Sequence, residues 1–264
     1  MTPRPHSDTE TRLAGFEARL QDAFAWANDH GREIMVGLGV LLLAGAILSG
    51  VYEWRRRAIA EEETELARIE MRFTTAMGAN PGEYFVPEPA NPEQATKARE
   101  AALAELDAFV AKHGGSELAA IAGIKAAELE VDLVRIDAAD ARLAKLAESL
   151  PANDARRAIA LRLRGYALDQ KGDTLGAAEA YEAGAKVEAY PPRALLWISA
   201  GDAYARANSP ARSIAAYREA LSVAPELAQQ EGIVQRIGIQ QAHLDAEAAP
   251  KPERAAAPEA AKPK

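Results

Sequence analysis

One stretch of the chain is apolar on every side. Residues 34–52 read IMVGLGVLLLAGAILSGVY and carry no charged side chain between Glu33 and Glu53. A helix of this length spans roughly 28 Å, which is close to the hydrocarbon thickness of a bilayer. The run has no polar stripe, so lipid suits it better than a protein core. A long polar stretch precedes it and apolar residues continue past Ala44-Gly45-Ala46, which favours an uncleaved anchor over a signal peptide.

The pattern before and after this run sets the membrane boundaries. We expect a transmembrane helix over 34–54, because Tyr52 and Trp54 suit the interfacial aromatic belt and Arg55-Arg56-Arg57 follow at once. Residues 1–33 form a tail with a short amphipathic helix, since one helical face collects Leu13, Phe16, Leu20 and Phe24. That helix either lies on the bilayer or begins a longer helix that enters it, and both remain open.

The remainder of the chain alternates apolar and polar positions with helical spacing. We assign residues 55–245 to one helical domain with a Pro/Gly-rich loop at 78–92. Residues 246–264 contain only Ala, Pro, Lys and Glu apart from Arg254, so we expect a disordered tail. The predicted fold class is all-α: a single N-terminal transmembrane helix followed by an α-solenoid of degenerate tetratricopeptide-like helix pairs.

Two helix pairs carry the tetratricopeptide signature. That signature places Gly or Ala where the two helices of a pair touch, and a bulky residue beside it. Gly165 and Gly201 are 36 residues apart, as are Tyr181 and Tyr217. A weaker pair at 121–150 keeps Ala127, Ala139 and Leu143, and Lys97–Phe109 is a candidate partner for the helix after the span. The signature positions of the two convincing pairs are Leu161, Gly165, Leu168, Ala177 and Tyr181, and then Trp197, Gly201, Tyr204 and Tyr217.

A polar helix is predicted to close the solenoid. Residues 226–244 are rich in Gln, and we expect one face to pack inward as a cap. The apolar residues of that face are Leu227, Val234, Ile237 and Leu244.

Composition argues for binding and against catalysis. The chain has no Cys, so disulfides, thiolate nucleophiles and Cys-based zinc sites are excluded. The net charge of −8 without a basic stripe is a poor match to nucleic acid. The four His residues are far apart, and no phosphate-binding or nucleophile motif occurs. We therefore predict no enzymatic activity, no cofactor and no metal.

The first helix of each pair should offer a groove to a partner. Residues off the packing face of two such helices lie three and four positions apart and would line one surface. This surface is either a groove that grips a peptide or an ordinary solvated face with local ion pairs. The candidate partner-binding residues are Arg162, Tyr166, Asp169, Gln170, Ser199, Asp202 and Arg206.

The order of these segments resembles a known family. A Phe-containing N-terminal helix, a Gly-containing single span within 24–54, an interfacial Tyr-x-Trp and degenerate tetratricopeptide repeats resemble the ancillary Sec-translocon subunit family, the YfgM-like proteins. The resemblance implies an inner-membrane protein with a periplasmic repeat domain. It also implies Sec translocon subunits, a membrane-anchored periplasmic chaperone or exported clients as protein partners, and a role in protein translocation.

The charges that flank the span point the other way. Arg19 and Arg32 precede the span within twenty residues, whereas five arginines follow it within the same distance: Arg55, Arg56, Arg57, Arg68 and Arg72. This asymmetry favours a cytoplasmic C-terminal domain, and a long domain can be translocated despite flanking charge. We retain the periplasmic orientation, with a cytoplasm-facing tether and a scaffold of another envelope complex as alternatives.

Overall fold

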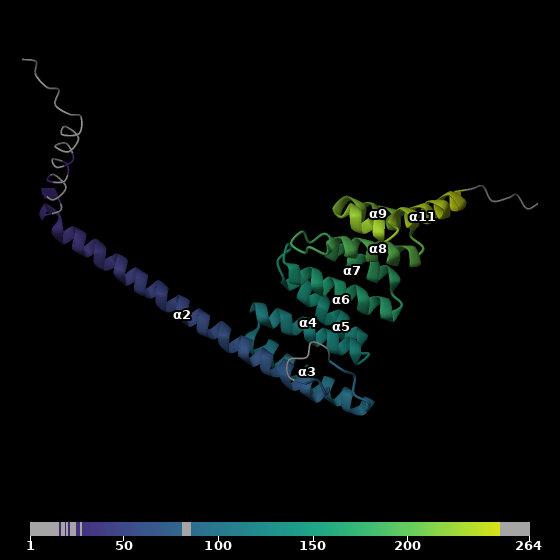
Figure 1. Cartoon of the computed structure of the whole chain (residues 1–264), viewed down its shortest axis with the longest axis horizontal. Coiled ribbons are helices and arrows are strands. Elements are labelled where there is room, and N and C mark those ends of the chain that lie inside the picture. Colours follow the sequence, from purple (N-terminus) through teal and green to yellow (C-terminus); the bar gives the residue numbers. More distant parts are fainter. Residues whose placement is uncertain are drawn as a thin grey trace, which may run out of the picture. The chain divides into compact units, whose positions relative to one another are not determined.

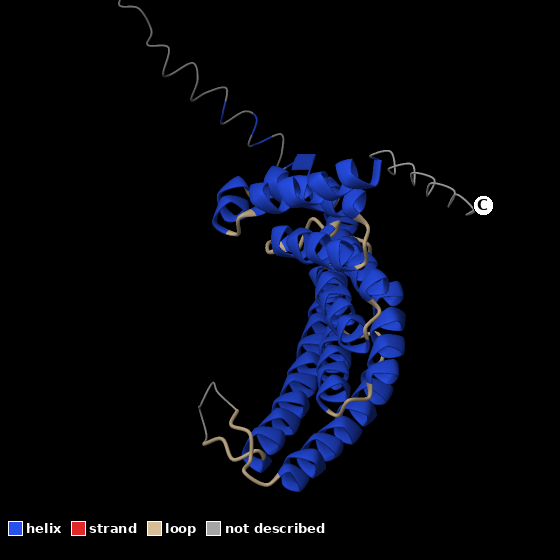
Figure 2. Ribbon diagram, turned by 90° about the vertical axis from the view of Figure 1, so that its right-hand side faces the viewer, coloured by secondary structure: helices blue, strands red, loops and turns tan. Residues whose placement is uncertain are grey.

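The computed structural model describes residues 16, 19, 21, 25, 26, 28–80 and 86–248, and every regular element among them is a helix (Figure 2). The chain divides into two compact units, Met1–Glu61 and Glu62–Lys264. Helix α2 (Gly31–Ala76) contributes residues to both units. The fold class is all-α, as the hydrophobic pattern predicts.

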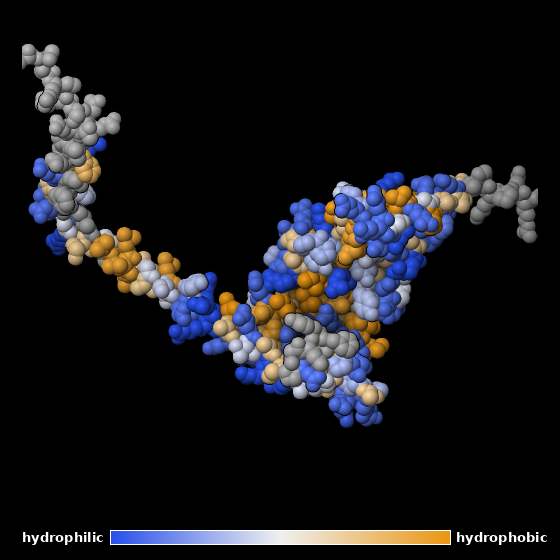
Figure 3. Space-filling model, in the orientation of Figure 1, coloured by the Kyte–Doolittle hydropathy of each residue, from blue (hydrophilic) through white to orange (hydrophobic). Residues whose placement is uncertain are grey.

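Unit 1 contains the apolar part of α2. This segment is long and apolar enough to span a membrane, and none of it is buried by protein. Leu41 and Leu48 are 71% and 70% exposed, and the run forms an orange stretch along α2 in Figure 3. The predicted span 34–54 lies within α2, which starts earlier and extends 22 residues further. Most of the predicted amphipathic helix before it lies outside the described residues.

Unit 2 is a stack of helices, each of which packs mainly on its neighbours in sequence (Figure 1). After the last turns of α2, the helices are α3 (Pro92–His113), α4 (Glu117–Asp132), α5 (Ile136–Ser149), α6 (Ala155–Lys171), α7 (Thr174–Ala185), α8 (Arg193–Arg206), α9 (Pro210–Val223), α10 (Pro225–Gln230) and α11 (Ile233–Ala248). The successive pairs are α2–α3, α4–α5, α6–α7 and α8–α9, with α10 and α11 at the end. Of the predicted tail 246–264, residues up to Ala248 belong to α11, and the remainder lies outside the described residues.

Short polar residues and glycines begin and end these helices. The side chains of Ser116, Asp154 and Asp173 accept hydrogen bonds from the first backbone N–H groups of α4, α6 and α7. Gly172 takes a left-handed conformation with φ 86°, which ends α6 before Asp173 begins α7. The turns are therefore encoded locally, and each pair folds back on itself within a few residues.

A Gly–Tyr contact closes each of the last two pairs, α6–α7 and α8–α9. A Cβ atom on Gly165 would lie 2.7 Å from the ring of Tyr181, and one on Gly201 would lie 2.4 Å from the ring of Tyr217. Tyr217 is 2% exposed. The helices of each pair approach so closely because these two positions have no side chain. In both pairs the tyrosine follows the glycine by sixteen residues.

The earlier pairs use smaller or less regular contacts. Ala127 of α4 and Leu143 of α5 are both fully buried and repeat the sixteen-residue spacing. The C-terminal part of α2 packs on α3, with Leu66 and Ile69 in one apolar cluster with Phe109. In the loop between them, Val86 packs beside Met77, while Tyr84 and Phe85 lie outside the described residues.

The end of the stack differs from the predicted single cap helix. The segment forms two helices, because Gly232 has a φ of 65° and interrupts the helix between α10 and α11. The interruption changes the helical phase: Ile233 is fully buried, whereas Val234 is 64% exposed. The prediction that Val234 faces inward is wrong for this reason.

Candidate functional site

The seven predicted partner-binding residues lie on α6 and α8, the first helices of successive pairs. We call this surface the α6–α8 face; it comprises Arg162, Tyr166, Asp169, Gln170, Ser199, Asp202 and Arg206. The signature residues of the same two helices, Gly165 and Gly201 among them, are buried against α7 and α9. The face is therefore the side of α6 and α8 that packing within each pair leaves accessible.

Four residues of this face are already bound within the protein. Asp169 accepts from the Arg206 guanidinium at 2.8 Å, which links α6 to α8. Asp202 accepts from Arg236 of α11 at 2.7 Å and from the Tyr217 hydroxyl at 2.5 Å. These bonds join α8 to α6, to its own partner α9 and to α11.

Ser199 is bound within its own helix, because its hydroxyl donates to the Leu195 carbonyl at 3.0 Å. The other three residues of the face, Arg162, Tyr166 and Gln170, form no hydrogen bond or ion pair with any residue that the structure describes. All three are exposed on α6, and Tyr166 exposes 48% of its surface. The groups free to meet a partner are thus a guanidinium, a phenol ring and an amide on one helix.

Two tyrosines of the second helices, Tyr181 of α7 and Tyr217 of α9, lie close to the aspartates of this face. Burial and the nearby Asp169 carboxylate raise the pKa of Tyr181 to about 12. Burial and the hydrogen bond to Asp202 likewise raise the pKa of Tyr217 to about 12. Both hydroxyls stay protonated at neutral pH, and the Tyr217 hydroxyl donates to Asp202 as a neutral group.

The structure adds two residues of α4 that the sequence analysis missed. Glu128 and Asp132 follow Ala127 by one and five positions, as Tyr166 and Gln170 follow Gly165. Burial raises the pKa of Glu128, and the charges of Lys125 and Arg162 partly offset this rise. The repeat register would have found both residues if Ala127 had been aligned with Gly165.

Ion pairs with the spacing of the repeat connect helices of neighbouring pairs. We call this set the ion-pair ladder; its members are Arg142–Asp107, Arg206–Asp169, Arg212–Glu179 and Arg236–Asp202, with N···O distances of 2.7–3.0 Å. The partners are 33 to 37 residues apart in sequence. Each pair is partly exposed, so each contributes at most about 1 kcal/mol to stability.

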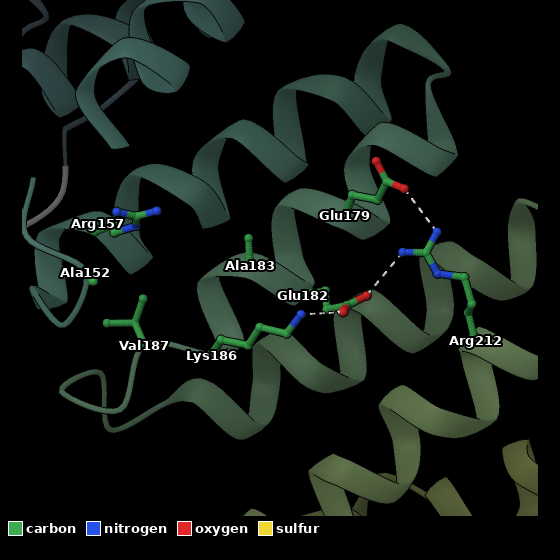
Figure 4. A pocket seen from close by; sticks show the side chains of 8 residues that line it. All are labelled: Ala152, Arg157, Glu179, Glu182, Ala183, Lys186, Val187 and Arg212. Carbon is green, nitrogen blue, oxygen red and sulfur yellow. Dashed lines mark hydrogen bonds and ion pairs between the residues drawn. The ribbon is translucent and has the colours of Figure 1, made fainter. Parts of the chain in front are cut away.

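A cavity of about 490 Å³ opens beside α7 and α9 (Figure 4). Glu182 accepts from Lys186 at 2.7 Å and from Arg212 at 3.4 Å. Burial alone would raise the pKa of Glu182. Hydrogen bonds from Lys186 and the Tyr204 hydroxyl lower it by more, so the net shift of the pKa is downward. The Arg212 guanidinium also lies 4.2 Å from the centre of the Tyr204 ring. The charges in this cavity are thus mostly satisfied by one another.

The described residues hold no group of three or more His, Asp or Glu arranged to bind a metal ion. Stacked helix pairs present extended surfaces on which other molecules bind. The arrangement of unit 2 is accordingly that of a protein-interaction module.

No protein-family model matches the chain, and no curated protein matches it. Among solved structures, the chain is similar to the crystal structure of MamA, with 16% sequence identity and a TM-score of 0.39. The match covers 59% of this chain and 94% of MamA. The assignment of the fold rests on the helix packing described above.

Proposed function

We propose that the protein is a membrane-anchored binding module that holds a segment of a partner protein on the α6–α8 face. The proposed organisation is a tail over 1–33, a transmembrane helix over 34–54, a helical domain over 55–245 and a terminal tail over 246–264. One observation carries the proposal. Arg162, Tyr166 and Gln170 are exposed and form no hydrogen bond or ion pair with a described residue, whereas Asp169, Asp202 and Arg206 of the same face are held by ion pairs.

This combination suits a protein ligand in an extended conformation. The Tyr166 ring offers a rigid apolar contact with a polar end, and aromatic side chains of this kind are common anchors in interfaces. The Gln170 amide has both donors and an acceptor for main-chain groups, and Arg162 can bind a carboxylate or carbonyl. The ion pairs on the same face hold α6 and α8 together, so little conformational entropy is lost when a partner binds.

The resemblance to YfgM-like proteins supports a specific setting for this binding. The partners would be Sec translocon subunits, a membrane-anchored periplasmic chaperone or exported clients, and the protein would assist protein export from the inner membrane. A scaffold of another envelope complex is the alternative. The arginines after the span favour a third possibility, a tether that faces the cytoplasm.

Co-purification tests the proposed partner and the face together. Full-length protein extracted in mild detergent should retain Sec subunits, and the triple variant Arg162→Ala, Tyr166→Ala, Gln170→Ala should lose them. The control Arg218→Ala, Gln235→Ala changes exposed residues on α9 and α11 and should retain them. If the wild type retains no Sec subunit, the export role is refuted. If the triple variant still retains its partners, the α6–α8 face is refuted and α2 becomes the next candidate.

Protease treatment of intact spheroplasts tests the orientation. Digestion of the C-terminal domain beside an intact cytoplasmic control protein is expected for a periplasmic domain. Protection until lysis would support the cytoplasmic tether and remove the basis for the export role.

A further inference from the structure

The pair α4–α5 reverses a packing pattern that the two later pairs share. Four residues before the contact glycine, the later pairs carry a large residue, Leu161 or Trp197. Three residues after the contact tyrosine, they carry a small one, Gly184 or Ala220. A Cβ atom on Gly184 would lie 3.0 Å from Cδ1 of Leu196 and 3.3 Å from Cβ of Leu161, so α6 and α8 both pack closely on the position where α7 has no side chain.

In α4–α5 the small residue comes first and the large one second. Gly123 lies four residues before Ala127, and Leu146 lies three residues after Leu143. A Cβ atom on Gly123 would meet only Leu146 within 4 Å, at 3.6 Å from Cδ2, an ordinary contact distance. Gly123 therefore adds no side chain on α4, and Leu146 of α5 packs beside this position.

A cavity of about 620 Å³ is open at this point. We call it the Gly123 pocket. Its apolar lining comes from three helices: Val110 of α3, Ala119, Ala120 and Gly123 of α4, and Leu146 of α5. The volume is within the range of about 300–1,000 Å³ that is typical of ligand sites. None of its lining residues belongs to the α6–α8 face.

The rim of the Gly123 pocket carries one basic residue, Lys145, whose charge no described carboxylate neutralises. Arg142, Lys145 and Arg156 line it, and Glu117 is the one acidic residue that does so among the described residues. Both arginines are already neutralised within the protein, since Arg142 pairs with Glu130 and Asp107, and Arg156 pairs with Asp154 and Glu117. Lys145 is exposed and forms no ion pair with a described residue. The N-terminal end of α4, which carries partial positive charge, also faces the pocket through Ser116 and Glu117.

We propose that the Gly123 pocket is a second protein-binding site, which takes one large apolar side chain of a partner segment flanked by acidic residues. The apolar side chain lies against Val110, Ala120 and Leu146. The flanking carboxylates lie near Lys145 and the N-terminal end of α4. This site is separate from the α6–α8 face and does not depend on the proposed function.

Peptide binding to the full-length protein in detergent tests the pocket. The probe is a fluorescein-labelled peptide with one Phe between two pairs of Asp in a Gly-Ser frame, followed by fluorescence anisotropy. Two counter-probes replace Phe by Ala or all Asp by Lys. The Phe–Asp probe should bind saturably and at least about tenfold more tightly than either counter-probe, because each loses the apolar or the charged part of the contact.

Two pairs of variants separate the pocket from other surfaces. Gly123→Leu places a side chain in the pocket and should weaken the probe at least about tenfold. Gly123→Ala adds only one methyl group to the pocket. It therefore controls for the gain in helix propensity when glycine is replaced. Lys145→Glu should weaken the probe at least about threefold. Lys97→Glu makes the same charge change on an exposed residue of α3 and should leave binding within about twofold of the wild type.

The outcomes are distinguishable. Saturable binding that Gly123→Leu and Lys145→Glu weaken, while the two controls do not, supports the pocket. Absence of saturable binding, equal binding of the Ala counter-probe, or unchanged binding by Lys145→Glu overturns it. If Gly123→Leu lowers the thermal stability more than Gly123→Ala does, its loss of binding could come from unfolding. Lys145→Glu then decides the test, because it changes only an exposed side chain.

Discussion

Gly201→Ala should destabilise the protein although alanine is the better helix former. A Cβ atom at this position would lie 2.4 Å from Cε1 and 2.5 Å from Cδ1 of Tyr217, whereas carbon atoms in contact are about 3.5–4.0 Å apart. The ring has little room to move, because Tyr217 is 2% exposed and its hydroxyl is held by Asp202 at 2.5 Å.

The expected loss follows from three opposing contributions. Alanine in place of glycine within a helix gains about 0.5–1 kcal/mol. Forcing an extra methyl group into a packed core costs about 1–3 kcal/mol. Displacing the Tyr217 hydroxyl from Asp202 costs roughly 1 kcal/mol more. The free energy of unfolding should therefore fall by about 1–3 kcal/mol.

Urea unfolding of the full-length protein in mild detergent, followed by far-ultraviolet circular dichroism, measures this loss. The matched control is Gly238→Ala on α11, where a Cβ atom would meet nothing within 4 Å and a gain of about 0.5–1 kcal/mol is expected. The double variant Gly201→Ala, Tyr217→Leu should lose less than the sum of the two single variants, because leucine leaves room for the methyl group. A stability gain for Gly201→Ala equal to that of Gly238→Ala, or strict additivity in the double variant, would refute the reasoning.

Three further predictions address other parts of the chain. Arg142→Met leaves the buried Glu130 carboxylate, 7% exposed, without its partner and should cost about 3–5 kcal/mol in urea unfolding, whereas Arg206→Met opposite the more exposed Asp169 should cost at most about 1 kcal/mol. Asp154→Ala removes the cap of α6 and should lower the unfolding free energy by about 1 kcal/mol. The hydrogen bond from Arg156 holds the pKa of Asp154 below its ordinary value of 3.8. The wild type should therefore lose stability as the pH falls through that lowered pKa. In acid titrations of thermal stability, Asp154→Asn should lose less stability over the same pH range. Leu42→Arg places a charge in the apolar run at a cost of about 2.5–3.5 kcal/mol of insertion free energy and should move protein from the membrane pellet to the supernatant in alkaline carbonate extraction; unchanged pelleting would count against the anchor.

The repeated part of the fold is the most predictable from the sequence, because its contacts are local. Gly165 with Tyr181 and Gly201 with Tyr217 each report a close helix contact through a spacing that the chain repeats. The all-α class follows from helical periodicity, and the long apolar helix follows from an uninterrupted run of apolar residues. The end of the stack was less predictable, because Gly232 adopts a left-handed conformation and separates α10 from α11.

The candidate site could be predicted only in part. The helix spacing placed seven residues on one face, but it did not indicate which of their charges would be taken by partners 34 or 37 residues away. Those pairings depend on how successive pairs stack. Glu128 and the empty position at Gly123 were missed for a related reason: the first pair uses Ala127 and Leu143 in place of Gly and Tyr, so its register becomes clear only when the contacts are known.

The ion-pair ladder also has a mechanical consequence. Its members join α5 to α3, α8 to α6, α9 to α7 and α11 to α8, so bending the stack at any of these junctions changes the distance between paired charges. Screening lengths shorten from about 8 Å at physiological ionic strength to about 3 Å at 1 M salt, which weakens these partly exposed pairs while the buried Gly–Tyr contacts are unaffected. Salt should therefore make the stack more flexible without unfolding it. The distance between the side chains of α6 and α8 should then vary with ionic strength.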